Sequence, residues 1–504
     1  MWTATSTPAA SPANVQSAMA GVTSQAARDD ALLRLEQRAH QELAAIEAPL
    51  REWVPERRDE NSRVMDDVVI VGAGLSGLSL AFGLMRQGLT RVKVIDTAPA
   101  GREGPWLNTA RMRTLRSPKT LTGPDLGVPS LTYRAWHETA YGPQSWEKLD
   151  KIERGDWMAY LVWFRGAVGM DVENETNLLG IEIRNGHLAA RVEKDGIERM
   201  MTCRKIVLAT GMEGAGGHHV PAAISDALPR DRWTHSGETI DMGFLSGRTV
   251  GVIGAAASSF DWAVAALEAG AKSVTILARS RGLPRTEVLD WSNFSGFLNH
   301  YADLDDISRY RFARRMFAFK TPPTTEMFER AMRFPECELV MGARLETLRM
   351  QDGDIAVSTA AGDFVFDHLL LGTGYTVDLR RRPELCGIID AVATWGDRFT
   401  PPAGEADDSL LAYPYLGPAF EFLEKEPGQS PLLRDIHIFN SAAVPSLGPV
   451  CNGITGLKSG VPRLVAGICR GLFLQDADLF YQTLDAYDKV HFEPQMVPGF
   501  DPRP

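Results

Sequence analysis

The stretch from Gly101 to Pro118 concentrates side chains that could bind anions or stabilise developing negative charge. Its sequence, GREGPWLNTARMRTLRSP, holds four arginines, one tryptophan and one asparagine, and it has the periodicity of neither a helix nor a strand. Guanidinium groups form charge-assisted hydrogen bonds, which are strongest where water is excluded. The whole chain carries a net charge of −11, so a stretch this basic needs a local explanation. The alternative to a chemical role is a set of exposed ion pairs, which contribute little to stability.

A glycine pattern before this stretch is typical of a dinucleotide-binding turn. An apolar strand, the glycines Gly72, Gly74 and Gly77, a helix and a second strand ending in Asp96 follow one another in that order. Gly72 permits the tight turn, Gly74 lets the backbone approach a pyrophosphate, and Gly77 allows close packing of the helix on the strand. The helix N-terminus attracts phosphate. Asp96 lies 19 residues after Gly77, where an acid usually accepts hydrogen bonds from a ribose.

A second strand–turn–helix–strand unit begins 182 residues later. Gly254 keeps the first glycine of the pattern, while Ala256 and Ser259 stand at the second and third glycine positions. The second strand of this unit is followed by Arg279 and Arg281, with no acid. Basic residues at that point suit the 2′-phosphate of NADPH and disfavour NADH. A pair of solvated arginines is the alternative.

The order of these units predicts the domain organisation. Residues 205–211 and 368–375 each read as an apolar strand followed by Thr-Gly, where the chain leaves and re-enters the first nucleotide domain. The second unit lies between them, together with an alternating stretch at 339–366 that favours a β-meander. We therefore expect an α/β protein with two Rossmann-like domains, the NADPH domain being inserted into the first.

The two ends of the chain predict helices and a tail. Leu32, Leu35, Ala39, Leu43 and Ile46 recur every three or four residues, so they indicate one face of a helix that packs on the protein's own body. Residues 1–27 are rich in Ala, Ser and Thr and favour a disordered tail. Near the other end we expect a helix over 461–472, with Pro462 in its first turn.

Composition excludes several classes of protein. The negative net charge argues against nucleic acid and anionic membranes as partners. No apolar run of membrane-spanning length occurs, and no secretory signal is evident. The five cysteines are widely spaced without a C-x-x-C pattern, so neither a redox dithiol nor a metal site is expected, and a cytoplasmic location fits. A homo-oligomer is left open.

The pattern resembles the two-dinucleotide (class B) flavoprotein monooxygenases, over roughly residues 66–485. This superfamily includes flavin-containing monooxygenases, amino-acid N-hydroxylases and Baeyer–Villiger enzymes. Gly254, Ser258 and Asp261 fit the G-x-G-x-S-G-x-D frame of the NADPH unit. Three further matches are partial. Gly104, Pro105 and Trp106 match the last three positions of a Gly-Gly-x-Trp motif, and Gly372, Thr373, Gly374 and Tyr375 match Ala-Thr-Gly-Tyr with glycine in place of alanine. His235 matches the histidine of the family fingerprint just before the NADPH unit.

The resemblance implies the chemistry of an FAD- and NADPH-dependent monooxygenase. It implies that a flavin C4a-hydroperoxide gives one oxygen atom of dioxygen to a small organic substrate. Thr239, four residues after His235, replaces the residue that marks the Baeyer–Villiger branch, so N- or S-oxygenation is slightly favoured. The alternatives are Baeyer–Villiger oxygenation, an NAD(P)H-dependent flavoprotein reductase or oxidase, and a non-catalytic nucleotide sensor.

The resemblance also implies the site. It places Trp106 and the residues after it beside the flavin. Gly453 and Gly456 lie in the loop that closes on the flavin. We expect one or two of the arginines to reach cofactor or substrate. The candidate catalytic residues are Asn108, Arg111, Arg113 and Arg116. The candidate cofactor-binding residues are Gly72, Gly74, Gly77, Asp96, Trp106, Gly254, Ser258, Arg279, Arg281, Thr373, Gly374, Gly453 and Gly456, and no metal ligand is expected.

The expected boundaries follow from these assignments. We expect residues 1–65 to form the tail and N-terminal helix, 66–234 the first part of the FAD domain, 235–370 the NADPH domain, and 371–504 the second part of the FAD domain with a C-terminal tail. The aromatic and basic segment 283–335 is expected to be a helical insertion near the substrate mouth. Asp290, Asn293 and His300 are its candidate substrate contacts.

Overall fold

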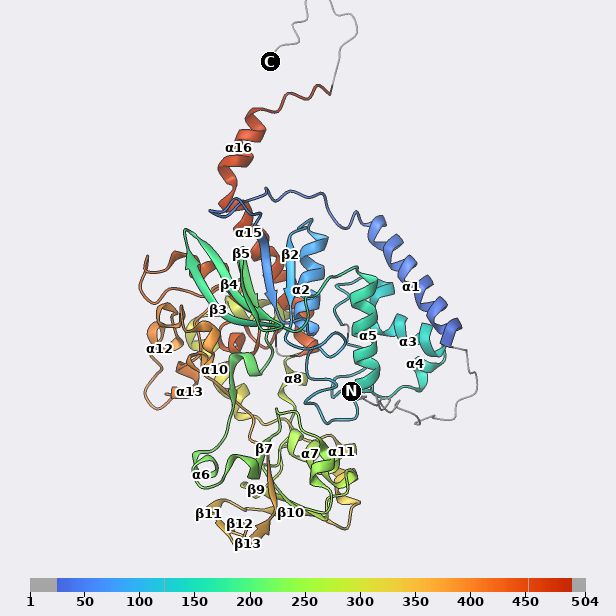
Figure 1. The fold of residues 1–504 in the computed structure, drawn as a ribbon, viewed down its shortest axis with the longest axis vertical. Coiled ribbons are helices and arrows are strands. Elements are labelled where there is room, and N and C mark those ends of the chain that lie inside the picture. Colours follow the sequence, from blue (N-terminus) through green and yellow to red (C-terminus); the bar gives the residue numbers. More distant parts are fainter. Residues whose placement is uncertain (1–24, 122, 452, 492–504) are drawn as a thin grey trace, which may run out of the picture.

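The computed structural model describes residues 25–121, 123–451 and 453–491. Most of the expected tail lies outside these residues, and 25–27 already belong to the first helix, α1 (Gln25–Ala45). Leu35 and Ala39 of α1 are buried, and Glu42 accepts hydrogen bonds from the backbone and hydroxyl of Ser130. The helix thus packs on the protein's own body, beside α3 (Tyr133–Tyr141), as Figure 1 shows.

The first domain is built on a sheet whose parallel part positions the first glycine turn. The strand order is β2-β1-β5-β4-β3, and β16 also pairs with β5. Strand β1 is parallel to β2 and to β5, and its residues Val68 to Ile70 are fully buried because both faces of the sheet are covered. The strands are β1 (Asp66–Val71), β2 (Val92–Ile95), β3 (Thr176–Arg184), β4 (His187–Lys194), β5 (Ile197–Leu208) and β16 (Ile436–Ile438).

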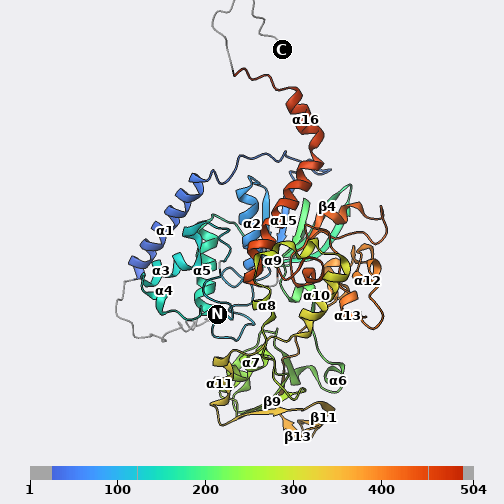
Figure 2. The ribbon, with the colours of Figure 1, turned by 180° about the vertical axis from the view of Figure 1, so that it is seen from behind.

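Two helices of the first domain contact each other, and a third packs against one of them. Helix α2 (Leu75–Arg86) follows the glycine turn and contacts α15 (Ile454–Gln475). Phe82 of α2 meets Phe164 of α5 (Arg154–Ala167) edge-on, with ring centroids 5.5 Å apart. The short helices of this domain are α4 (Ser145–Lys148), α12 (Trp395–Arg398), α13 (Asp408–Leu411) and α14 (Val444–Leu447), and α16 (Ala477–Asp485) projects from the body (Figures 1 and 2).

The predicted C-terminal helix was placed too late in the chain. Helix α15 begins at Ile454, seven residues before the expected start, and Pro462 therefore lies inside the helix. Gly456 and Gly460 lie so close to the backbone of Val450 that a Cβ at either position would overlap it. This packing of small residues lets the loop before the helix lie against its first turns, so the glycines belong to the helix.

The second domain is a parallel sheet in the order β10-β9-β8-β14-β7, drawn below the first domain in Figure 1. Helices α7 (Ala257–Glu268) and α11 (Thr325–Met332) contact each other, while α6 (Ala222–Ser225) packs near a three-stranded meander. The strands are β7 (Trp233–His235), β8 (Thr249–Ile253), β9 (Ser273–Ala278), β10 (Cys337–Met341) and β14 (His368–Leu371), and the meander comprises β11 (Leu345–Gln351), β12 (Asp354–Thr359) and β13 (Gly362–Phe366). The expected meander is present, although its first residues join the parallel sheet as β10.

Two short strands carry the chain between the domains. Strand β6 (Gly216–His218) leaves the first domain, and β15 (Tyr375–Val377) returns to it, paired antiparallel with β6. The second sheet thus lies in sequence between β5 and β16 of the first sheet, which is the insertion that the sequence predicts. Strand β7 spans the expected boundary at 234/235 and is the edge of the second sheet.

The helical segment after β9 bridges back to the first domain. It consists of α8 (Val288–Trp291), α9 (Ser295–His300) and α10 (Asp306–Ala318). Helix α9 contacts α15, and α10 contacts α14. Tyr301 donates a hydrogen bond of 3.2 Å to the carbonyl of Pro445, and Arg309 donates one of 3.1 Å to that of Ser446. Among the described residues, no helix has both the length and the apolar character to cross a membrane.

Candidate dinucleotide and oxygenation site

The first glycine turn has the close packing that its sequence predicts. Gly72 has φ +104°, and a Cβ there would lie 2.5 Å from the carbonyl oxygen of Ala209. A Cβ on Gly77 would overlap the carbonyl of Gly72. Gly74 differs, because the nearest atom to its Cβ would be the Cα of Gly104, at 3.7 Å. The protein itself therefore requires glycine at 72 and 77, while at Gly74 it leaves space at the N-terminus of α2.

Asp96 closes this turn from the end of β2. Its carboxylate accepts hydrogen bonds from the backbone N–H groups of Ala73, at 2.6 Å, and Ala98, at 2.7 Å. Burial raises the pKa of this carboxyl. Asp96 thus ties the second strand to the glycine turn, and the expected hydrogen bonds to a ribose stay a prediction.

The loop after Asp96 brings an unpaired donor to the same place. The indole of Trp106 packs edge-on against Trp157, with centroids 6.1 Å apart, and its Nε1–H is buried without a hydrogen-bond partner in the described part of the chain. A buried donor without a partner is costly unless something accepts from it. A phosphate or flavin oxygen would do so, so the residues around Gly74 and Trp106 fit a bound dinucleotide.

Two side chains fix the shape of that loop. The amide of Asn108 donates to the carbonyls of Arg102, at 2.6 Å, and Gly104, at 3.0 Å. Glu103, which replaces the first glycine of the resembled motif, is buried and accepts from Arg165 at 2.8 Å. Both donors of Asn108 are therefore used within the loop, and its carbonyl oxygen is the group left for a ligand.

The second glycine turn compensates for its missing glycines. Gly254 has φ +114°, and a Cβ there would lie 2.6 Å from the carbonyl of Gly372. Ser259, at the third glycine position, is buried, and its hydroxyl occupies the space that a Cβ on Gly372 would need. The glycine that replaces alanine before Thr373 thus makes room for the serine. Ser258 lies in the first turn of α7.

The segment between α10 and α11 contacts the N-terminus of α7, and the sequence did not predict this contact. The carbonyl of Thr321, between α10 and α11, accepts a hydrogen bond of 3.0 Å from the backbone N–H of Ala257. The first N–H groups of a helix have no partner within the helix, and a phosphate at the second turn would bind to them. The N–H of Ala257 is one of these groups, and the carbonyl of Thr321 already accepts its hydrogen bond. Only a contact across 64 residues of chain reveals this arrangement, so no local pattern could have predicted it.

The two arginines after β9 are free. Arg279 and Arg281 are exposed, and neither forms a hydrogen bond or ion pair with any residue that the structure describes. Their position at the carboxyl end of β9 is where the sequence places a ribose phosphate.

The arginines of the opening stretch contact the second domain. Arg116 forms an ion pair of 2.5 Å with Asp261 of α7. Burial raises the pKa of Asp261 to about 6, although Arg116 acts in the opposite direction. The guanidinium of Arg111 lies 5.0 Å from the ring centroid of Trp262, also of α7. Arg113 lies 3.9 Å from Glu153 and is half exposed. The stretch thus joins the domains, and a direct role in catalysis stays a prediction.

The candidate residues on the return path lie at the connection between domains. The hydroxyl of Thr373 donates to the carbonyl of His219, and Gly374, with φ +81°, accepts from Nε2 of His235 at 2.8 Å. His235 is stacked on His218 with centroids 4.3 Å apart. Burial lowers the pKa of His235 to about 4, so the ring is neutral at neutral pH.

The remaining candidates lie on or directly beside the helices α8, α9 and α15. Gly453 caps the N-terminus of α15, and Gly456 lies in its first turn. Asn293 has a buried Oδ1 without a partner among the described residues, whereas Asp290 is exposed and His300 faces Asp303 at 3.1 Å on the surface. Of these three, Asn293 alone has a polar side-chain atom that is buried and without a partner in the described part of the chain.

Two sheets with parallel strands that lead into glycine turns, one inserted in the chain of the other, are typical of two-dinucleotide flavoproteins. A family described as FAD-NAD(P)-binding matches residues 69–213. The chain is 38% identical to an FAD-dependent urate hydroxylase of Xanthomonas campestris over 467 residues, which cover 92% of this chain and 97% of the relative. The chain therefore belongs to the class B flavoprotein monooxygenase superfamily. It is an FAD-dependent monooxygenase of the hydroxylase type, with binding of FAD and NAD(P).

Solved structures share the fold. The ornithine hydroxylase of Pseudomonas aeruginosa superposes with a TM-score of 0.64 at 15% identity, covering 81% of this chain and all of that one. The L-lysine 6-monooxygenase of Pseudomonas syringae gives 0.58 at 16% identity, covering 80% and 99%. Bacillithiol disulfide reductase of Staphylococcus aureus gives 0.52 at 15%, covering 80% and 98%. The fold alone thus serves monooxygenases and reductases, and it is the curated relative that excludes a reductase or a nucleotide sensor here.

Proposed function

We propose that this monooxygenase hydroxylates a small, urate-like compound with dioxygen and uses NADPH as its electron donor. The observation that carries the substrate class is the 38% identity to the urate hydroxylase, which extends over nearly the full length of both chains. Urate is a planar anion at neutral pH, so binding it requires flat apolar walls and a positive group.

The preference for NADPH rests on Arg279 and Arg281. Both guanidinium groups are exposed at the end of β9 and have no carboxylate partner among the described residues. A 2′-phosphate would provide that partner, and charge-assisted hydrogen bonds to it would favour NADPH over NADH.

The chain's own residues bind and orient the two nucleotides. Bound NADPH would supply two electrons, and bound FAD would use them to transfer one oxygen atom of dioxygen to the substrate while the other oxygen atom is reduced to water. Gly72, Gly74 and Gly77, with the N-terminus of α2, would hold the pyrophosphate of FAD, and Trp106 Nε1 would donate to the same cofactor. The N-terminus of α15, at Gly453, would stabilise negative charge on the flavin ring. Asp96, Gly254, Ser258, Thr373, Gly374 and Gly456 would line the two nucleotides.

In this proposal the opening stretch supports oxygenation by holding the two domains together. Arg116 and Arg111 hold it against α7. We keep Arg111, Arg113 and Arg116 as candidate catalytic residues, since a guanidinium group that reaches the reacting groups would offset negative charge there, and we keep Asn108, whose carbonyl oxygen would accept a hydrogen bond.

The experiment is a substrate comparison with the FAD-loaded enzyme. Oxidation of NADPH is measured with urate, with ornithine and with a simple ketone, and the products are analysed by mass after reaction under isotopically heavy dioxygen. We expect urate to stimulate NADPH oxidation and to gain one labelled oxygen. Labelling of ornithine would instead support N-oxygenation, and labelling of the ketone a Baeyer–Villiger reaction. Either result without labelling of urate would overturn the proposed substrate class.

A further inference from the structure

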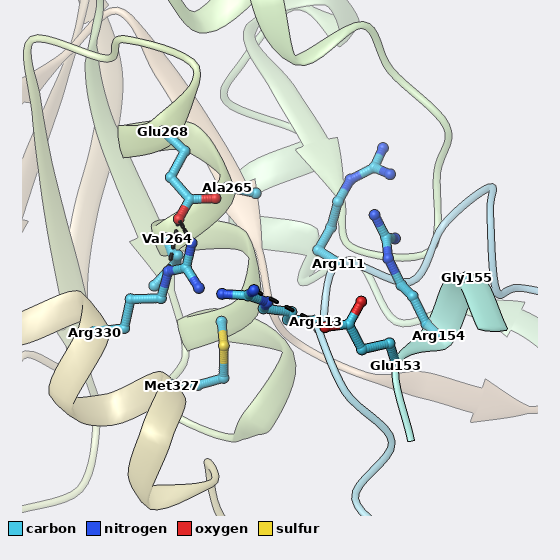
Figure 3. Close-up of a pocket in the computed structure, with 10 residues that line it drawn as sticks. All are labelled: Arg111, Arg113, Glu153, Arg154, Gly155, Val264, Ala265, Glu268, Met327 and Arg330. Carbon is cyan, nitrogen blue, oxygen red and sulfur yellow. Dashed lines mark hydrogen bonds and ion pairs between the residues drawn. The ribbon is translucent and has the colours of Figure 1, made fainter. Parts of the chain in front are cut away.

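A cavity of about 420 Å³ lies between the two domains, away from the glycine turns. One wall comes from the first domain, with Arg111 and Arg113 of the opening stretch and Arg154 at the start of α5. The other wall comes from α7 and from Met327 and Arg330 of α11. Figure 3 shows the guanidinium groups of Arg111 and Arg154 side by side, with Arg113 directed between the walls.

The positive charge in this cavity is incompletely balanced. Four arginines and two glutamates line it. Glu268 pairs with Arg330, and Glu153 lies 3.9 Å from Arg113, too far for a direct hydrogen bond.

Neither of the other two arginines forms a direct ion pair with a carboxylate in the described residues, although the charge of Asp261 in α7 acts on Arg154. Arg111 donates to the carbonyl of Asn108, and Arg154 donates to that of Ala110. The Nε of Arg111 is buried without a partner. Burial lowers the pKa of Arg111, and the charge on Arg154 lowers it further. Two like charges are therefore held together at a half-buried position, where an anion would relieve the repulsion.

This cavity is separate from the second nucleotide turn. Phosphate binding by that turn would use the N-terminus of α7, where the N–H of Ala257 already donates to the carbonyl of Thr321. Val264, Ala265 and Glu268 line the cavity, and they lie two to three helical turns further along. At a rise of 1.5 Å per residue, Ala265 is about 12 Å along the axis from Ala257. A ligand in the cavity would thus contact a different part of the helix from the nucleotide.

We infer that this cavity binds the phosphate group of a small organic phosphate and thereby joins the two domains. Guanidinium groups match phosphate geometry, and the neighbouring guanidinium groups of Arg111 and Arg154 offer several donors to one dianion. The volume exceeds that of a bare phosphate ion, and Val264, Ala265 and Met327 give an apolar wall for the organic part. Since the walls belong to two domains, a bound ligand would favour the arrangement in which they meet.

The test is calorimetric titration of the FAD-loaded enzyme at constant ionic strength, with saturating NADP⁺ present to fill the nucleotide site. Inorganic phosphate, glucose 6-phosphate and AMP are titrated separately. We expect at least one to bind, and tighter binding of either ester than of inorganic phosphate identifies an organic phosphate. Equal or tighter binding of inorganic phosphate would overturn the organic part of the inference. Absence of binding by all three, or binding only when NADP⁺ is left out, would overturn it entirely.

Matched variants locate the bound phosphate. Arg154→Gln should weaken binding by about tenfold or more, because it removes a charge-assisted donor, and Arg330→Gln should also weaken it, because it leaves the carboxylate of Glu268 unpaired beside the anion. Arg333→Gln is the control, since Arg333 follows Arg330 by three residues, does not line the cavity and pairs with Glu329 on the surface. Flavin content and melting temperature check that the variants fold. Equal weakening in Arg333→Gln would mean that the effect is general electrostatics, and the inference would fail.

Discussion

Alanine at Gly77 should destabilise the fold, whereas alanine at Gly74 should mainly weaken FAD binding, although the two positions lie in one turn. A Cβ on Gly77 would lie 1.8 Å from the carbonyl oxygen of Gly72. That oxygen belongs to the backbone, so Gly77→Ala requires the turn or the start of α2 to move. Overpacking of this kind usually costs about 1–3 kcal/mol, and a backbone obstacle places this case at or above the upper end.

Gly74→Ala should be tolerated by the fold. The nearest atom to the new Cβ would be 3.7 Å away, and Gly74 has φ −67°, which alanine adopts without strain. Gly74 is the residue that caps α2, where alanine is a poorer cap than glycine, so we expect a loss of stability below about 1 kcal/mol. The methyl group would instead occupy the space that the proposed pyrophosphate needs.

The assay measures two quantities for each variant. The first is the flavin bound per protein after reconstitution with FAD, and the second is the melting temperature of the flavin-free protein before reconstitution. We expect Gly74→Ala to melt close to the parent protein and to bind little flavin. Gly77→Ala should melt several degrees lower or fail to accumulate. Full flavin occupancy in Gly74→Ala would refute the assignment of the turn to FAD, and a normal melting temperature in Gly77→Ala would refute the packing argument.

Three further predictions concern the nucleotides and the contact between domains. Replacing Arg279 and Arg281 by alanine should raise the KM for NADPH by about tenfold or more and leave that for NADH nearly unchanged; equal effects on both would contradict the 2′-phosphate site. Trp106→Phe keeps the ring but removes the indole donor, so the Kd for FAD should rise while the melting temperature of the flavin-free protein holds, and unchanged FAD affinity would count against this contact. The pKa of Asp261 is raised to about 6, so the folded state holds a proton that the unfolded state releases near pH 4, and stability should fall as pH rises from about 4 to about 6. Denaturant titrations at several pH values should show a smaller fall in Asp261→Asn, and an identical pH dependence would exclude this group as its source.

The sequence predicts the two nucleotide units because the patterns that define them are local. The run from Val68 to Asp96 contains its own strand, turn, helix and strand, and the apolar residues of such a parallel strand need no knowledge of their neighbours to be recognised. The order of Thr-Gly motifs around the second unit likewise predicts that it is inserted in the first.

The features that the sequence did not reveal depend on contacts between distant segments. Ser259 fits at a glycine position only because Gly372, more than a hundred residues later, leaves it space. The start of α15 depends on Gly456 packing against Val450 across a loop. The local periodicity of a single sequence reveals neither of these contacts. The presence of the C-terminal helix was therefore predicted correctly, but its first residue was not.

In the candidate site too, some residues could be identified from local patterns and others only from contacts in the folded chain. The glycines and the residues at strand ends were identifiable from spacing, whereas Arg154 could not be, because its importance comes from lying beside Arg111 in the folded chain. The arginines of the opening stretch were noticed as unusual in an acidic protein. That their contacts would be with Asp261 and Trp262 of the second domain required the structure.

The antiparallel pairing of β6 with β15 has a practical consequence for protein engineering. It brings the position where the chain leaves the first domain next to the position where it returns, at His218 and Tyr375. Residues between these positions form a cassette, and the corresponding segment of a relative could be spliced in without opening the first sheet. Such a chimera must retain α9 and α10 of this chain, because both helices pack on the first domain. Since both helices lie inside the cassette, the exchange takes two pieces of the relative's sequence, one before α9 and one after α10, and it would test whether nucleotide preference resides in the second sheet.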